Sequence, residues 1–421
     1  MQVITENKVV PKLRFEEFEM EWVKVLLKNC TLKIGSGLTP KGGNKVYQKV
    51  GIPFIRSQNV IDNKLVLSDN IFISDEINSK MKGSIVKPND ILLNITGGSI
   101  GRSCVVPLEF VKGNVNQHVC IIRLDNEHTP YFIQPFLASQ RGQKLIQQGQ
   151  TGSGREGLNF QSIASFKLHL PSLPEQQKIA SFLSAVDDKL QQLNKKKELL
   201  EEYKKGVMQK IFSQEIRFKD DNGNKYPNWE EKKMGAIGET FNGLTGKTKV
   251  DFGRGKPFIQ YMQIFNSAKI DTSKFGYVDI NEGEKQKTAK YGDVFFTTSS
   301  ETPLEIGYAS VLTEEIEEVY LNSFCFGYRP NSLTELYPDF SSYLFRSEFL
   351  RKQIVKLAQG STRYNMSKVQ LMKVLIQLPS LDEQQKIANF LSSLDSKIEL
   401  VSTQIENTKA FKKGLLQQMF V

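Results

Sequence analysis

The feature that most constrains this chain is a long segment that occurs twice. The segment that begins Leu-Pro-Ser-Leu-Pro-Glu-Gln-Gln-Lys-Ile-Ala at Leu170 returns, with Asp in place of the second Pro, at Leu378, an offset of 208 residues. The match continues without a gap to Phe212 and Phe420. Self-similarity at a fixed offset is typical of a repeated structural unit. Two copies in one chain indicate a function with two sites.

Weaker matches continue upstream of both copies. They are Pro-Phe-Ile at 53–55 and 257–259, Gly-Leu-Thr at 37–39 and 243–245, Asp90 and Asp293, and Gly-Ser with a following Arg at 152–155 and 360–363. Each half is therefore one divergent region followed by one well-matched region. We expect the matched segments to do the same job twice and the divergent regions to do different jobs.

The matched segments predict two long amphipathic helices. Their apolar residues follow mixed steps of three and four, broken once at Lys197, which is typical of a coiled coil. These residues are Ile179, Phe182, Val186, Leu190, Leu193, Leu200, Tyr203, Val207 and Ile211, and then Ile387, Phe390, Leu394, Ile398, Val401, Ile405, Phe411, Leu415 and Met419. Some 35 helical residues span about 50 Å. Because such a helix is not stable alone, we expect the two copies to pair.

The start of each helix is also predicted. Ser172-x-x-Glu175 and Ser380-x-x-Glu383 have the spacing of capping boxes, in which the serine and glutamate side chains bond the first free backbone amides. Pro174 suits a first helical position.

The divergent regions predict a mixture of strands and helices. Short apolar runs bounded by Gly, Pro, Asn or Asp predict strands at 51–55, 90–95, 119–124 and 293–297, and helical spacing occurs at 131–147 and 340–357. The predicted fold class is α+β, with two strand-rich globular domains joined by two long helices. We place the domains at 1–169 and 213–377, and the helices at 170–212 and 378–421.

Composition limits the class of protein. A chain of 421 residues exceeds a single typical core. No apolar run approaches the roughly 20 residues of a membrane span, and the first 20 residues are too charged for a signal peptide. We therefore expect a soluble, cytoplasmic protein.

The cysteines and histidines predict no metal site. The four cysteines form no Cys-x-x-Cys pair, and only three histidines occur. This pattern argues against zinc and against a disulfide framework. We expect Cys30, Cys104, Cys120 and Cys325 to be buried thiols.

The net charge of +10 suits a polyanionic partner, although simple solubility explains it equally well. Residues 1–169 carry +7 of this charge, whereas residues 213–377 carry +1 and include the acidic run at 314–318. A nucleic-acid-binding face in the second region would therefore be local.

No catalytic motif occurs in the context that its chemistry requires. Gly-Ser-Gly-Arg-Glu-Gly at 152–157 matches the dinucleotide fingerprint, but it follows a helical stretch and does not open a helix. Gly-Lys-Thr at 246–248 lacks the first glycine of a phosphate loop. The chain has no His-Glu-x-x-His and no base-reading motif of amino-methyltransferases. We predict a protein without catalytic residues, cofactor or metal.

A polar loop in both halves is the best candidate for a binding site. Glycine, hydroxyl and arginine groups suit a phosphate clamp or a reader of base edges, and the alternative is an ordinary connecting loop. Polar residues near strand ends have the same two interpretations. The candidates are Arg56, Gln58, Asn59, Asn94, Thr96 and Arg155 in the first half, and Gln260, Tyr261, Thr298, Ser299, Arg363 and Tyr364 in the second.

The duplicated Glu-Gln-Gln-Lys-Ile segment and the two variable regions of about 160 residues resemble the DNA-specificity subunits of type I restriction-modification systems, over essentially the whole chain. The resemblance implies that each variable region is a target recognition domain for one half of a split, asymmetric DNA site. It further implies an antiparallel helix pair with pseudo-twofold symmetry between the halves. Methyltransferase subunits, which carry S-adenosylmethionine, and restriction subunits are the implied partners.

Other classes of protein stay open at this point. A stand-alone modification enzyme would require a cofactor site. A coiled-coil adaptor that does not bind DNA would leave the two arginine-bearing loops unexplained. A specificity subunit of a methylation-only system would share every feature above. The sequence does not define the bases that are read or the length of the spacer between half-sites.

Overall fold

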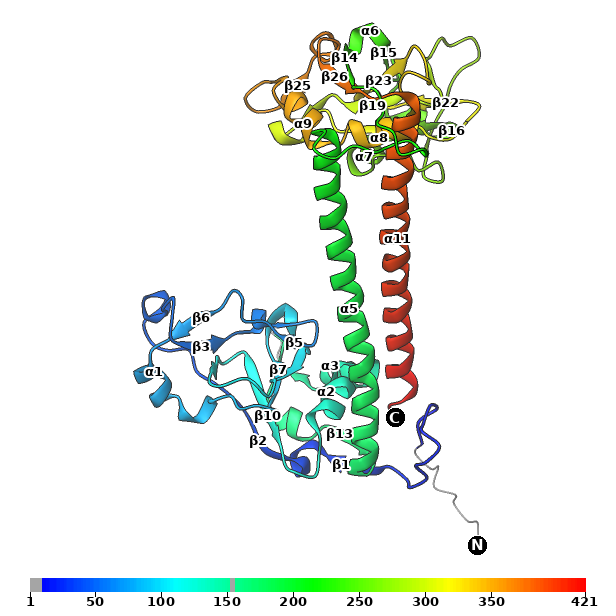
Figure 1. Ribbon diagram of the computed structural model, residues 1–421. Helices are drawn as coiled ribbons and strands as arrows, with labels where there is room; N and C mark the ends of the chain where they lie inside the picture. Colours follow the sequence, from blue (N-terminus) through cyan, green and yellow to red (C-terminus); the bar gives the residue numbers. More distant parts are fainter. Residues whose placement is uncertain (1–9, 152–155) are drawn as a thin grey trace. The chain divides into compact units, whose positions relative to one another are not determined.

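The computed structural model describes residues 10–151 and 156–421, which divide into two units (Figure 1). Unit 1 comprises the chain up to Asn194 together with Thr403–Val421, and unit 2 comprises Lys195–Ser402. No helix in the described ranges is long and apolar enough to cross a membrane. Both units contain parts of the same two long helices.

The long helices are α5 (Leu173–Phe212) and α11 (Leu381–Gln418), and they pack antiparallel as predicted (Figure 1). In unit 1 the first half of α5 shares a buried cluster with the end of α11, and in unit 2 the end of α5 shares one with the start of α11. The first cluster includes Ile179, Leu183, Val186, Leu415 and Met419; the second includes Ile211, Phe212, Ile387, Leu391 and Leu394.

The predicted apolar stripe is buried or half-buried except at one position in each helix. Tyr203 and Phe411, which are equivalent at the 208-residue offset, are 53% and 54% exposed, so their assignment to the stripe was wrong. The residues that follow them, Lys204 and Lys412, turn toward the opposite helix and pair with Asp395 and Asp187. The charged pair occupies the helix interface at this turn in place of the aromatic ring.

The prediction of capping boxes was also wrong. The Glu175 carboxylate accepts hydrogen bonds from Arg14 Nε (2.7 Å), Arg14 Nη2 (2.8 Å) and Trp22 Nε1 (3.1 Å), and Ser380 Oγ has no hydrogen-bond partner among the described residues. α5 begins at Leu173, so Pro174 is its second residue. Tertiary contacts that span about 160 residues have replaced the local cap.

The second copy repeats this arrangement. Glu383 accepts hydrogen bonds from Arg217 Nε (3.1 Å), Arg217 Nη2 (2.6 Å) and Trp229 Nε1 (3.1 Å). The next residues, Gln176 and Gln384, each donate to the carbonyl of a proline five residues earlier and accept a backbone N–H from the preceding domain, at Thr129 and Tyr337. The Glu-Gln-Gln segment therefore fastens each long helix to its globular domain.

Each unit contains an antiparallel four-stranded sheet with the same topology. In unit 1 the order is β2 (Thr31–Ser36), β10 (Val119–Leu124), β7 (Ile91–Asn94) and β8 (Ser103–Val105). In unit 2 it is β15 (Gly238–Asn242), β23 (Cys325–Pro330), β19 (Val294–Thr297) and β21 (Ala309–Val311). The predicted strands at 90–95, 119–124 and 293–297 are confirmed as β7, β10 and β19.

A second sheet repeats in both units as well. β3 (Ile52–Ile55) lies between β6 (Ile71–Ile73) and β9 (Asn114–Val115), and β16 (Phe252–Ile259) lies between β17 (Gly276–Val278) and β22 (Val319–Leu321), which also pairs with β18 (Thr288–Ala289). β3 pairs parallel with β9, and β16 pairs parallel with β22. The Pro-Phe-Ile match of the sequence thus marks one structural position in both copies.

Short pairs and single turns complete the two units. In unit 1 they are β1 (Val23–Leu26) with β13 (Lys167–Leu170), β4 (Val60–Ile61) with β5 (Lys64–Leu65), β11 (Gln150–Thr151) with β12 (Gly157–Leu158), and helices α1 (Asp75–Lys80) and α4 (Phe160–Ala164). In unit 2 they are β14 (Glu230–Lys233) with β26 (Leu375–Leu378), β20 (Ser299–Ser300) with β25 (Tyr364–Met366) and β24 (Ala358–Gln359), and helices α6 (Met234–Ile237), α7 (Tyr261–Asn266) and α10 (Lys368–Leu371).

The helical stretches predicted at 131–147 and 340–357 each form two helices rather than one. They are α2 (Pro130–Ala138) with α3 (Gln140–Gln148), and α8 (Pro338–Leu344) with α9 (Glu348–Val355). The second helix of each pair has a serine N-cap, because Ser139 Oγ accepts from the Gly142 amide and Ser347 Oγ accepts from the Leu350 amide. These caps end the first helix and start the next.

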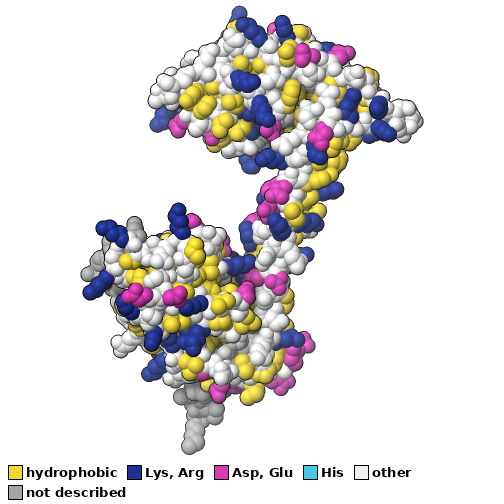
Figure 2. Space-filling model, turned by 60° about the vertical axis from the view of Figure 1, so that its left-hand side comes forward, with side chains coloured by type: hydrophobic (Ala, Val, Ile, Leu, Met, Phe, Trp, Pro, Cys, Tyr) yellow, Lys and Arg dark blue, Asp and Glu magenta, His cyan; other side chains and the backbone are white. Residues whose placement is uncertain are grey.

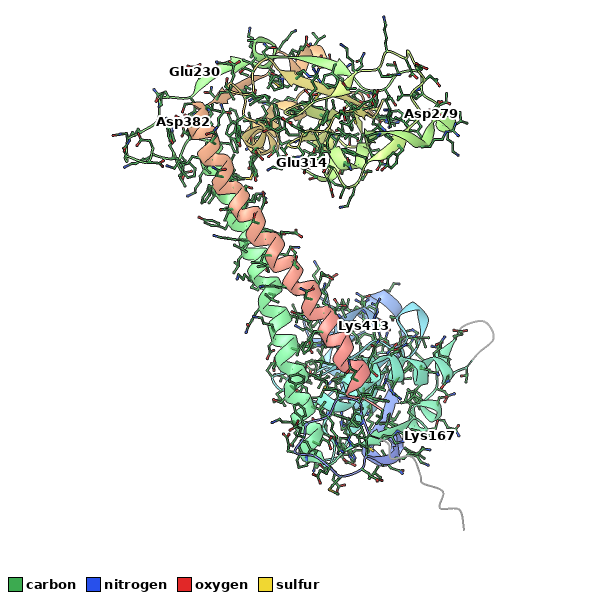
Figure 3. All side chains as sticks on the ribbon, turned by 90° about the vertical axis from the view of Figure 1, so that its right-hand side faces the viewer. Lys167, Glu230, Asp279, Glu314, Asp382 and Lys413 are labelled. Carbon is green, nitrogen blue, oxygen red and sulfur yellow. The ribbon has the colours of Figure 1, made fainter. Side chains whose placement is uncertain are left out.

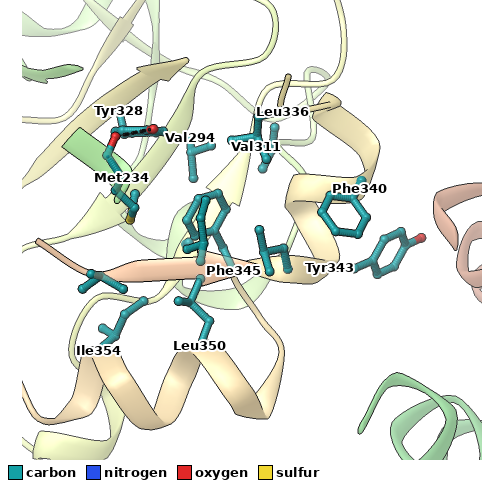
Figure 4. Close-up of a cluster of buried hydrophobic side chains, with 14 of the residues drawn as sticks. Met234, Val294, Val311, Tyr328, Leu336, Phe340, Tyr343, Phe345, Leu350 and Ile354 are labelled. Atoms are coloured by element: carbon teal, nitrogen blue, oxygen red, sulfur yellow. Dashed lines mark hydrogen bonds between the residues drawn. The ribbon is translucent and has the colours of Figure 1, made fainter. Parts of the chain in front are cut away.

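The core of each unit lies between the four-stranded sheet, the helix pair and the long helices. Figure 4 shows this core in unit 2, where Val294, Phe345 and Leu350 meet between β19, α8 and α9 and the Tyr328 hydroxyl donates to the Met234 carbonyl (2.9 Å). One aromatic residue at the end of each long helix enters such a core. Phe420 contacts the rings of Phe132 and Phe136 in unit 1, and Phe212 contacts those of Trp229 and Phe340 in unit 2.

A buried ion pair also occurs at the same place in both units. Asp90 and Asp293, which precede β7 and β19, are each held by two hydrogen bonds from an arginine, Arg123 and Arg329, at 2.7–2.8 Å. Two parallel N–H bonds to one carboxylate fix both orientation and register. The Asp90–Asp293 match therefore reflects a shared structural pair.

All four cysteines are free and buried, as predicted. Burial raises the pKa of Cys30 to about 11 and the pKa of Cys104, Cys120 and Cys325 to about 12. Because the thiolate is the reactive form, these groups are unreactive near neutral pH.

Candidate nucleic-acid interface

The first candidate residues in unit 1 lie where β3 ends. Arg56 and Gln58 belong to the turn after the strand, and Gln58 is exposed. Asn59 is buried, with Oδ1 accepting from the Arg56 amide (2.9 Å) and Nδ2 donating to the Val66 carbonyl (2.9 Å). Asn59 therefore shapes the turn that presents Gln58.

Asn94 connects this turn to the end of β7. Its side chain is buried, and Nδ2 donates to the Ser57 carbonyl (2.9 Å) and to Ser99 Oγ (3.2 Å). The side chains of Asn59 and Asn94 point inward, so neither can reach a base in this conformation. We assign them to positioning the loops and keep Arg56 and Gln58 as proposed contacts.

Thr96 lies in a hollow of about 680 Å³ beside the β11–β12 hairpin. Its hydroxyl is hydrogen-bonded to His118 Nδ1 (2.6 Å), and its backbone bridges to Gly157. Glycine backbone at 97, 98 and 157 also lines the hollow. Arg155, another candidate of the first half, lies outside the described residues.

Unit 2 brings its candidates together at the equivalent place. The Tyr261 hydroxyl donates to the Ser299 carbonyl (2.9 Å), and β20 pairs with β25 so that Ser300 faces Tyr364. The Thr298 hydroxyl donates to the Phe324 carbonyl (2.7 Å). Gln260, which precedes α7, is exposed. Residues that are far apart in sequence therefore form one polar patch.

Arg363 lies at the tip of the hairpin that joins β24 and β25. It is exposed and forms no ion pair within the described part of the chain. The turn requires glycine at 360, where φ is 126° and a Cβ atom would meet the Arg363 carbonyl at 2.2 Å. Burial raises the pKa of Tyr261, and the positive charge of Arg363 opposes only part of this rise. Because the pKa stays above its ordinary value, the tyrosine hydroxyl is a neutral donor.

An aromatic ring lies beside each hairpin, at His118 and Phe324, and neither residue was among the sequence candidates. The amides of His118 and Phe324 donate to the side chains of Asn116 and Asn322 (3.0 and 2.8 Å), so the two residues occupy equivalent positions. Phe324 is 63% exposed. The signal in the sequence is an Asn-x-aromatic triplet before an apolar run in both halves, at 116–118 and 322–324.

Figure 2 shows Lys and Arg side chains interspersed with Asp and Glu on the face of unit 1 that it presents. Phosphate contacts on this face would therefore depend on individual side chains rather than on one basic patch.

The fold and the site together define a class of protein: a duplicated chain with two α+β domains that each present a polar loop patch and are each fastened to a long helix. The family described as "Type I restriction modification DNA specificity domain" matches residues 21–202 and 226–409, and the chain belongs to this family.

Relatives and solved structures agree with this assignment. The chain is 26% identical over 376 residues to the type I restriction enzyme MjaVIII specificity subunit of Methanocaldococcus jannaschii, covering 82% of each protein. It is 19% identical over 387 residues to the EcoKI specificity subunit of Escherichia coli K12, covering 87% of this chain and 80% of the relative.

The type I restriction-modification S subunit from M. genitalium shares the fold with a TM-score of 0.55 at 15% identity, over 98% of this chain and 99% of that one. A chain from a structure on assembly and conformational transition of the type I restriction-modification system gives a TM-score of 0.60 at 17% identity, over 95% and 97%.

Proposed function

We propose that this chain is the DNA-specificity subunit of a type I restriction-modification complex, with unit 1 and unit 2 each reading one half of an asymmetric split site. The observation that carries the proposal is the repetition of one loop patch on one scaffold with unlike side chains. Thr96 and His118 in unit 1 occupy the positions of Ser299 and Phe324 in unit 2. The same backbone thus presents different groups to two different half-sites.

The chain would supply recognition and assembly but no chemistry. Methyltransferase subunits would carry S-adenosylmethionine and methylate adenine, and restriction subunits would add cleavage. A methylation-only complex is the second candidate, because the same loop patches and helices would serve it equally well.

The test is the methylated motif in cells. Exchanging residues 1–169 for those of a relative should change one half of the methylated sequence and leave the other half intact, because the two patches lie in separate units. Sequencing that detects modified adenine in cells with and without the gene measures this. A change in both halves at once would contradict independent reading, and methyl transfer by the purified chain alone would contradict the absence of chemistry.

Replacing Arg363 by alanine should weaken binding to duplex DNA. If the side chain reads a base, the loss should be about 1–3 kcal/mol, and specificity at one position of the half-site of unit 2 should relax. If it holds a phosphate, binding to all sequences should weaken equally. The slope of log affinity against log salt concentration should then become shallower by about one. Fluorescence anisotropy of the assembled complex at several salt concentrations distinguishes the two.

The matched control is Lys397→Ala, which removes an exposed positive charge from α11 of unit 2. It should leave affinity within a factor of two. Equal losses in the two variants would show that only net charge matters, and no loss in the Arg363 variant would reduce the hairpin to a connection.

A further inference from the structure

Unit 2 contains a groove with two arginines that form no ion pair with the described residues. The groove has a volume of about 1250 Å³ and is lined by residues of α5, α9, α11 and the turn at Pro303–Glu305. Arg346, Arg351 and Tyr308 are among the lining residues. Both guanidinium groups lie over the Tyr308 ring, at 4.7 and 4.5 Å from its centre.

Besides the Tyr308 ring, backbone carbonyls hold both arginines. Arg346 donates to four carbonyls, at Ile264, Phe265, Ser267 and Ala309, and Arg351 donates to those of Leu304 and Gly307. Neither side chain forms an ion pair with any described residue. Burial lowers the pKa of Arg346 to about 10 and lowers that of Arg351, so both stay charged at neutral pH. Several N–H donors of the pair remain unused.

The fold itself does not require these charges. A corresponding groove in unit 1 is lined by Leu190, Lys412 and Gln417, which match Ile398, Lys204 and Gln209 at the 208-residue offset. Lys413, on the last turns of α11 (Figure 3), also lines the groove of unit 1 and matches Lys205.

In unit 1, however, Ala138 and Gln143 stand where unit 2 has Arg346 and Arg351. Gln143 donates to the Gly101 carbonyl (3.1 Å), just as Arg351 donates to the Gly307 carbonyl (2.8 Å). A neutral side chain is therefore sufficient to brace this loop. The positive charge in unit 2 is an addition to the shared scaffold.

The other lining residues favour a protein over DNA as the source of the anion. Glu201, Glu348 and Asp395 line the same groove, and the last two pair with Lys352 and Lys204, so the groove presents charges of both signs. Met208, Leu304 and Ile398 add apolar surface that a DNA backbone cannot match. A protein surface supplies charges of both signs together with apolar side chains.

We propose that Arg346 and Arg351 form a carboxylate-binding site that takes an Asp or Glu side chain of a methyltransferase subunit docked on unit 2. This proposal rests on the proposed function, because the partner is identified from that function. A planar guanidinium binds a carboxylate through two parallel hydrogen bonds. The equivalent groove of unit 1 lacks this site, so the two halves of the chain hold their partners differently.

The test uses the full chain and a methyltransferase subunit of the same system. Arg351→Gln copies unit 1 and keeps a donor for the Gly307 carbonyl, so the fold should survive. We expect the dissociation constant for the subunit to rise at least tenfold in calorimetric titrations, with a weaker dependence on salt. Arg351→Lys keeps the charge but loses the paired donors. Its dissociation constant should lie between those of the unsubstituted chain and Arg351→Gln. Lys373→Gln, an exposed charge outside the groove, should change nothing.

Two results would overturn the site. One is normal subunit binding by folded Arg351→Gln. The other is normal subunit binding with weakened DNA binding, which would assign the arginines to phosphates. The proposed function fails separately, if the unsubstituted chain with its methyltransferase subunit directs no methylation. Arg346→Ala serves as a second variant, with its folding checked by thermal unfolding because it loses four carbonyl contacts.

Discussion

Replacing Phe420 by alanine should destabilise unit 1 by about 3–5 kcal/mol, the usual cost of truncating a buried aromatic side chain. Phe420 is 1% exposed and contacts Phe132 and Phe136 at ring-centre distances of 5.2 and 5.8 Å. It belongs to the last residues of the chain, yet it completes the core of the unit that begins the chain. Phe212→Ala should have the corresponding effect on unit 2, because Phe212 packs against Trp229 and Phe340.

The two units can be followed separately in one sample. The chain contains two tryptophans, Trp22 in unit 1 and Trp229 in unit 2. With fluorotryptophan incorporated, fluorine NMR during urea unfolding should show the Trp22 signal of Phe420→Ala shifting to its unfolded position at lower urea, while the Trp229 signal keeps its midpoint. Phe411→Ala, which removes an exposed ring from α11, is the matched control. Equal shifts of both signals would show that the units unfold together.

Replacing Glu383 by alanine should destabilise unit 2 by about 3 kcal/mol. Breaking a buried ion pair costs about 3–5 kcal/mol because one group is left without its partner, and the lower end applies since the Arg217 side chain retains 23% exposure. The Trp229 indole N–H would also lose its acceptor. Asp382→Ala, one residue earlier at the exposed start of α11 (Figure 3), should cost much less.

Glu175→Ala is the corresponding change in unit 1, where Arg14 and Trp22 would lose the same acceptor. The midpoints of chemical unfolding, read from the tryptophan signal of each unit, measure both effects. If the glutamates acted as helix caps, a loss of only about 1 kcal/mol would be expected for each. A small effect would therefore contradict the arginine and tryptophan contacts.

The sequence alone was sufficient for the features that depend on local periodicity. Apolar spacing predicted both long helices, short runs bounded by turn residues predicted β7, β10 and β19, and the 208-residue repeat predicted two similar units. These signals are readable because the burial of a helix face or a strand repeats every few residues. The family resemblance came from the same repeated segment.

The tertiary structure decided which polar residues face solvent and which partners they have. Glu175 and Glu383 had the spacing of a cap, but bidentate contacts to Arg14 and Arg217 are available only once the domain folds onto the helix. A loop sequence carries no periodic signal for whether a side chain turns inward, so Asn59 and Asn94 read as exposed candidates although both are buried.

The same limit applies to proximity. Tyr261, Ser299 and Tyr364 become neighbours only through the pairing of β20 with β25 and the hydrogen bond from Tyr261. The sequence thus determined the two long helices, several core strands, the duplication and the family, because these follow from local pattern and from repetition. The tertiary structure alone decided the composition of the loop patches and the unpaired charges of Arg346 and Arg351, because these depend on contacts between residues far apart in the chain.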